Sequence, residues 1–248
     1  MARLSAAERR AALEAVQRDI RALRLPGLVG PPVHGPPVVA PVFLLGQAPG
    51  PHEARFGRPF AWTAGRTLFA WMHRSFGATE QEFRDRVYMA AVVRAFPGKT
   101  SGGGDRVPSP VEIEASRGFI EREIEILRPR LVIPVGRLAI EQVLGKGVAL
   151  DQVVGRLVRT RYHGIPVEVI SLPHPSGAST WFKVEPGATL LAKALRQLGR
   201  HPAIRRLFGL TPPASPARAR RRAGSSPGLA RQRATGRRSG PARRAPGR

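Results

Sequence analysis

The feature that most restricts the possible folds of this 248-residue chain is a series of three short apolar runs, each followed by a helical segment. The apolar runs span residues 38–46, 86–93 and 130–136, and the helical segments span 63–76, 109–127 and 137–145. A short, continuous apolar run is typical of a strand that is buried on both faces. Strands that alternate with helices pair in parallel and carry helices on both faces of the sheet. We therefore expect a single three-layer α/β/α domain with a mostly parallel central sheet.

Further elements are expected toward the two ends of this domain. Ser5 and Glu8 have the spacing of a capping box, which predicts a first helix before the sheet. Residues 156–162 and 165–172 flank a His-Gly turn, which predicts two more strands. A last helix is expected at about residues 188–198.

The C-terminal segment differs in composition from the rest of the chain. Residues 211–248 contain 11 arginines and no acidic residue, and they are dense in Pro, Gly and Ser. Such a segment cannot bury enough apolar surface to fold, so we expect a disordered basic tail. The expected organisation is an N-terminal helix and linker at 1–37, the α/β domain at 38–210 and the tail at 211–248.

The charge of the chain suggests a polyanionic partner. The net charge is +24, of which residues 1–210 keep +13 when the 11 tail arginines are removed. Arginine makes up 37 of the 41 basic residues, and its planar guanidinium fits phosphate oxygens. We therefore expect DNA as the partner; an arginine-rich bias in the coding sequence is the alternative.

Composition also excludes several kinds of site. The chain has no cysteine, so it lacks disulfides and the thiolates of a zinc site or iron–sulfur cluster. No apolar run approaches the ~18 residues that a membrane span needs, and the charged start lacks the apolar core of a signal peptide. We expect a monomer in the cytoplasm, associated with the nucleoid, without metal or other cofactor.

Two loops of unusual composition follow expected strands. The letters GQAPG at 46–50 force an irregular backbone whose N–H groups can point toward a ligand. The letters HPSG at 174–177 follow the strand at 165–172. Ligands of such sheets bind beyond the carboxyl ends of the strands, so both loops are candidates for one site.

Together the two loops resemble the uracil-DNA glycosylase superfamily, whose first motif is a strand end of the GQDPYH or GEAPG type and whose second is an HPS loop. The segments GRPF at 57–60, AGRTLF at 64–69 and RPRLVIPVGRLAI at 128–140 are similar to further segments of that superfamily. The resemblance covers about residues 38–200. It implies hydrolysis of the bond between a deaminated base, extruded into a pocket, and its deoxyribose, which initiates base excision repair.

The resemblance also implies roles for matching positions. His174 would donate a hydrogen bond to the negative charge that develops on uracil O2, and Phe60 would stack on the base; a structural loop histidine and a core phenylalanine are the alternatives. The backbone of Gln47 and Ala48 would contact the base edge or position the water. The other expected contacts are Gly46, Pro49, Gly50 and Ala91 for the base, and Ser176, Gly177, Ala178 and Ser179 for the DNA beside it.

The sequence departs from the superfamily where the attacking water is activated. Ala48 stands where familiar uracil-excising members have an aspartate, and Gln47 stands where the iron–sulfur class has a glutamate. Glu53 is the first candidate to replace these carboxylates; Asp105 and His52 are the others.

Two more departures concern the base and the duplex. No asparagine is present to distinguish uracil from cytosine, and Ala91 lies in the segment where one is expected. The side chain that fills the space of the extruded base is replaced by Ala178, while Trp181 and Phe182 could insert instead or belong to the core. The glycine-rich segment 101–110 is either a phosphate contact or a flexible connection. Two hypotheses follow: a uracil-DNA glycosylase that extends to other deaminated bases, or a non-catalytic nucleic-acid-binding protein that keeps the pocket.

Overall fold

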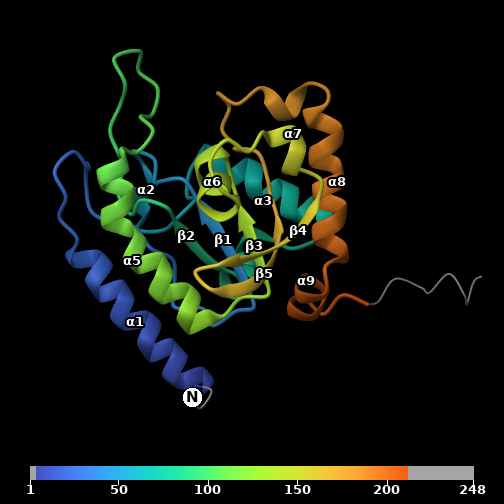
Figure 1. The fold of residues 1–248 in the computed structure, drawn as a ribbon, viewed down its shortest axis with the longest axis horizontal. Helices are drawn as coiled ribbons and strands as arrows, with labels where there is room; N and C mark the ends of the chain where they lie inside the picture. Colours follow the sequence, from blue (N-terminus) through green and yellow to red (C-terminus); the bar gives the residue numbers. More distant parts are fainter. Residues whose placement is uncertain (1–3, 212–248) are drawn as a thin grey trace, which may run out of the picture. The chain divides into compact units, whose positions relative to one another are not determined.

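Five strands form a central sheet in the order β2-β1-β3-β5-β4 (Figure 1). The computed structural model describes residues 4–211. The strands are β1 (Val42–Gly46), β2 (Tyr88–Ala91), β3 (Leu131–Pro134), β4 (Leu157–Tyr162) and β5 (Ile165–Ile170). All neighbouring strands pair in parallel except β4, which pairs antiparallel with β5. The expected mostly parallel sheet is confirmed.

Helices lie on both sides of this sheet. They are α1 (Ala6–Ala22), α2 (Glu53–Phe56), α3 (Thr63–Phe76), α4 (Glu80–Arg86), α5 (Pro110–Leu127), α6 (Arg137–Leu144), α7 (Leu150–Val153), α8 (Gly187–Arg200) and α9 (Pro202–Leu207), with a 3₁₀ turn η1 (Trp181–Lys183). In Figure 1, α1 and α5 run side by side on one flank of the sheet, and α8 covers the other flank.

The side chains of β1 divide between two apolar cores, as the alternation of a strand requires. Val42 and Leu44 pack with residues of α3 and α8, whereas Phe43 and Leu45 pack with residues of α5 and α6. All four are fully buried, and each contributes about 1.5–3 kcal/mol of hydrophobic stabilisation. The three-layer α/β/α architecture is therefore confirmed.

Local signals account for where several helices begin. The expected capping boxes at Ser5 and Ser109 are both formed, with Glu8 and Glu112 as their second members. Helix α4 begins with a third capping box, formed by Thr79 and Glu82, which was not predicted from the sequence. Helix α8 is also not the last described helix, because α9 follows it directly.

The described residues end at the start of the expected C-terminal tail. The expected tail at 211–248 lies outside the described residues, apart from Thr211. Within residues 4–211, no helix combines the length and the apolar character that crossing a membrane requires.

Candidate active site

The two candidate loops leave the same edge of the sheet, on either side of the end of β3. Pairing continues past β1, since the backbone N–H groups of Val92 and Val93 donate to the carbonyl oxygens of Gly46 (2.9 Å) and Gln47 (3.1 Å). On the other side, the Gly136 N–H donates to the Leu172 carbonyl oxygen at 2.9 Å. Both loops therefore begin from backbone that the sheet holds in place.

Phe60 lies over the end of β1. A Cβ added to Gly46 would lie 2.8 Å from Phe60 Cζ, so only glycine leaves room for the ring at this position. Ala91 is the register partner of Gly46 on β2 and is buried. Phe60 itself has a left-handed backbone (φ 52°), which is unusual for a bulky residue and requires support from its surroundings.

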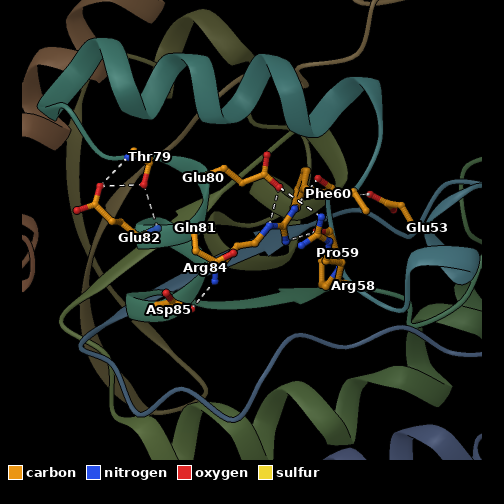
Figure 2. Close-up of polar contacts among 11 residues, drawn as sticks. Glu53, Arg58, Pro59, Phe60, Thr79, Glu80, Gln81, Glu82, Arg84 and Asp85 are labelled. Atoms are coloured by element: carbon orange, nitrogen blue, oxygen red, sulfur yellow. Dashed lines mark hydrogen bonds and ion pairs between the residues drawn. The ribbon is translucent and has the colours of Figure 1, made fainter.

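Arg84 of α4 provides part of that support (Figure 2). Its guanidinium donates to the carbonyl oxygens of Pro59 (2.8 Å) and Phe60 (2.9 Å), pairs with Glu80 at 2.8 Å and lies 4.6 Å from the centre of the Phe69 ring. Arg84 is buried, so these charge-assisted hydrogen bonds are shielded from water. They hold the segment that carries Phe60 against α4.

Glu53 holds the same segment from the other side (Figure 2). Its Oε2 accepts a hydrogen bond from the Gly50 N–H (2.7 Å), and its Oε1 accepts one from the Ala61 N–H (3.1 Å). Burial raises the pKa of Glu53, and the backbone hydrogen bonds oppose this rise. Both oxygens of this carboxylate are thus directed at backbone, and they connect loop 46–50 to the Phe60 segment.

His174 lies against the end of β3. A Cβ on Gly136, which has φ 87°, would approach His174 Cδ2 to 3.0 Å, so the imidazole also depends on a glycine. His174 Nδ1 contacts the Ser176 hydroxyl at 2.9 Å and accepts from the Ser176 N–H at 3.3 Å. A backbone N–H can only donate, so in the neutral ring the proton is on Nε2. Burial lowers the pKa of His174 and so favours this neutral form, although the Asp105 carboxylate acts in the opposite direction.

Asp105 reaches this site from the glycine-rich segment, which forms an anchored hairpin. Asp105 Oδ1 pairs with Lys99 Nζ at 2.6 Å, and the next residue, Arg106, makes contacts of 2.6 and 2.9 Å with Glu112 at the start of α5. A Cβ on Gly50 would lie 4.0 Å from Asp105 Oδ2. Within residues 4–211, Oδ2 accepts no hydrogen bond, and the Asp105 side chain is 48% exposed beside loop 46–50.

The remaining predicted positions form the exposed rim and the floor of this region. Ser176 and Ser179 close a turn, in which the Ser179 N–H donates to the Ser176 carbonyl oxygen at 3.1 Å, while Gly177 and Ala178 are exposed. Gln47, Ala48 and Gly50 are half-buried, and Pro49 is buried.

Trp181 and Phe182 behave as parts of the core. The ring of Phe182 meets that of Trp71 edge to face at 5.1 Å between centroids, and both Trp181 and Phe182 pack on the α3–α8 side of the sheet. A Cβ on Gly187 would overlap the carbonyl oxygen of Trp181, so this turn is tightly fitted to α8.

The 248-residue sequence has no cysteine thiolate that could bind an iron–sulfur cluster, and within residues 4–211 no three histidine, aspartate or glutamate side chains gather as a metal site.

Comparison with known proteins places these features in a family. The model of the uracil DNA glycosylase superfamily matches residues 32–199. The type-4 uracil-DNA glycosylase of Sulfurisphaera tokodaii is 27% identical over 143 residues, which are 56% of this chain and 61% of that protein. The proteins of the same name from Archaeoglobus fulgidus (28% identity; 55% of this chain, 66% of that protein) and Pyrobaculum aerophilum (31%; 54% and 66%) are similar to it in the same way. The chain thus spans slightly less than two thirds of the length of these curated relatives. On the family match, which covers most of its described residues, the chain belongs to the uracil DNA glycosylase superfamily.

Proposed function

We propose that this protein is a DNA glycosylase that hydrolyses the N-glycosidic bond of uracil, and of other deaminated bases, in DNA and so initiates base excision repair. The observation that carries the proposal is the geometry of His174: its ring packs against Gly136 and its Nδ1 accepts from the Ser176 N–H, so in the neutral ring Nε2 carries the proton and can donate. Family membership and relatives named uracil-DNA glycosylase support the same reaction.

His174 and Phe60 would act on the leaving base. As the bond between C1′ and N1 breaks, its electron pair moves onto the base, and negative charge develops on O2. The His174 Nε2–H would donate to that oxygen, an interaction that strengthens as the charge develops. Phe60 would stack on the base over Gly46, while the backbone of Gln47 and Ala48 and the neighbouring Pro49, Gly50 and Ala91 would line its edges.

Asp105 is our candidate for the group that activates water. Glu53 is the first candidate from the sequence, but both of its carboxylate oxygens accept hydrogen bonds from backbone N–H groups. We therefore propose that Glu53 holds loop 46–50 in place. Asp105 Oδ2 lies beside the same loop and is open. Water would bond to C1′ through its oxygen and lose a proton to this carboxylate as the base departs.

The residues at the rim of the site bear on whether the substrate is single-stranded, mismatched or fully paired DNA. Extruding a base from a duplex costs a few kcal/mol, and the cost is smallest where the base is mismatched or unpaired. Ala178 is too small to fill the space of the departed base, and Trp181 and Phe182 are half-buried and pack against the core. We therefore propose single-stranded or mismatched DNA as the preferred substrate, with Ser176, Gly177 and Ser179 beside its phosphates.

The setting of this activity is also proposed. A monomer acting on nucleoid DNA in the cytoplasm fits the net charge of +24, and the arginines of 211–248 would add phosphate contacts outside the domain.

The direct test is base excision by the purified full chain. Oligonucleotides containing uracil, hypoxanthine or xanthine would be incubated with the protein, and abasic sites would then be cleaved with alkali. We expect strand cleavage at uracil. No cleavage at any of the three bases, from protein that binds the same oligonucleotides, would favour the non-catalytic alternative that Ala48 and Ala91 suggest.

A further inference from the structure

Three aromatic rings lie together beside the candidate active site: the exposed Phe56 and Trp62 and the half-buried His52, which we call the aromatic platform. The Trp62 ring lies 4.6 Å from the His52 ring and 6.0 Å from the Phe56 ring, centre to centre, and it stacks on Phe56 at 24°. Phe56 is 49% exposed and Trp62 is 48% exposed. Among the Phe, Tyr and Trp residues within 4–211 they are the two that are exposed, since the others there are at least half-buried.

The platform is physically continuous with the candidate active site. Trp62 follows Phe60 by two residues, His52 directly precedes α2, and Phe56 is the last residue of α2, which begins at Glu53. The Glu53 carboxylate binds the N–H groups of Gly50 and Ala61, so it fixes the base-site loop and the platform to each other. A strand with one base stacked on Phe60 would then bring a neighbouring nucleotide to the platform.

The charges around the platform suit a phosphate backbone. Arg55, Arg58 and Arg66 are all exposed and lie within four residues of Phe56 or Trp62 in the sequence. Arg58 makes a long contact of 4.0 Å with Glu80, and within residues 4–211 neither Arg55 nor Arg66 forms an ion pair. Exposed aromatic rings with guanidinium groups beside them are the pattern by which proteins bind single-stranded nucleic acid, through stacking on any base and attraction to its backbone.

We propose that the aromatic platform stacks on an unpaired base of the DNA strand next to the extruded base. The inference rests on the proposed glycosylase function for its place on the substrate, and it identifies the surface that selects single-stranded DNA. The platform also supplies contacts to an unpaired strand that Ala178 cannot make.

Binding of DNA without uracil tests the platform separately from catalysis. The full chain would be titrated with a short labelled oligothymidylate and with a base-free oligomer of the same deoxyribose-phosphate length. We expect Trp62→Ala and Phe56→Ala to weaken oligothymidylate binding by about 5- to 150-fold, the range of one stacked base, and to leave binding of the base-free oligomer unchanged. Trp62→Phe should keep most of the affinity, and Val111→Ala, which changes an exposed apolar residue on α5, should keep all of it.

Two results would contradict the proposal that the platform stacks on a base. One is wild-type affinity for oligothymidylate in both alanine variants, with folding verified by circular dichroism. The other is an equal loss on the base-free oligomer, which would assign the effect to charge. Uracil excision measured on the same preparations separates the two proposals. If the wild type does not excise uracil but Trp62→Ala weakens binding, the glycosylase proposal is refuted and the platform remains a nucleic-acid-binding surface. If the wild type excises uracil but the variants bind as the wild type does, only the platform proposal is refuted.

Discussion

The same substitution, glycine to alanine, should have opposite effects in two helices of this protein. Gly65 lies in the first turn of α3, and a Cβ there would overlap the carbonyl oxygen of Phe60. Gly118 lies in the interior of α5, and a Cβ there meets nothing within 4 Å. Gly118→Ala is therefore a matched control for Gly65→Ala.

The expected magnitudes follow from these surroundings. Alanine in a helix interior is favoured over glycine by about 0.5–1 kcal/mol, so Gly118→Ala should stabilise by that amount. Gly65→Ala has the same gain but must push apart two backbone segments, and overpacking of this kind costs about 1–3 kcal/mol. Its net effect should be a loss of up to about 2 kcal/mol, because Arg84 and Glu53 keep the Phe60 segment from moving away.

Thermal and urea unfolding would measure both variants. About 1 kcal/mol corresponds to roughly 2–4 °C in the unfolding midpoint of a domain of this size, so the two midpoints should move in opposite directions. Gly65→Ala should also slow uracil excision, because the added methyl strains the backbone of Phe60, whose ring would stack on the base. If Gly65→Ala is as stable as Gly118→Ala and excises normally, the close contact between α3 and Phe60 does not support the site.

The remaining predictions concern catalysis, pH and substrate. His174→Ala should lower single-turnover excision of uracil by ~10²-fold or more, the usual effect of losing one donor to a developing oxyanion; an unchanged rate contradicts its role. Asp105→Asn should also lower the rate by ~10²-fold or more, whereas Lys99→Met, which breaks the same surface ion pair but keeps the carboxylate, should stay within a few fold. The hydrogen bonds from Arg106 and then Ser109 lower the pKa of Glu112 from 4.5 to about 2. The stability it contributes is therefore complete above about pH 4.5 and is lost as the pH falls toward 2, so Glu112→Gln should lower the urea midpoint at neutral pH but not near pH 2. Finally, kcat/KM should be higher for uracil in single strands and G·U mismatches than in A·U pairs, and equal values would show that another group replaces the missing wedge at Ala178.

The elements that sequence reasoning located are those with local signals. Helix α3 spans the predicted residues 63–76, and α5 begins at the predicted capping box, because periodicity and caps depend on neighbours in sequence. Helix α4 carried the same kind of signal in its Thr79–Glu82 capping box and could have been found. The order of the strands could not have been predicted in this way, since it depends on packing between segments that are distant in the sequence.

The same distinction applies to the site. The motifs pointed to His174 and Phe60, but not to the residues that hold them. Arg84 supports Phe60 from 24 residues away, and Gly136 makes room for His174 from 38 residues away. Neither belongs to a local pattern, so only the folded chain reveals their contacts. The open oxygen of Asp105 likewise depends on a hairpin that a run of glycines does not predict.

Strand order has a consequence for the size of the bound group. Loops 46–50 and 174–177 follow β1 and β5, and β3 is the single strand between them. Neighbouring strands lie about 4.8 Å apart, so the points at which the two loops leave the sheet are separated by roughly 10 Å. That span is fixed by backbone hydrogen bonds and does not vary with side chains. Such a span would suit one flat ring that receives hydrogen bonds from both loops, as the proposed glycosylase function requires.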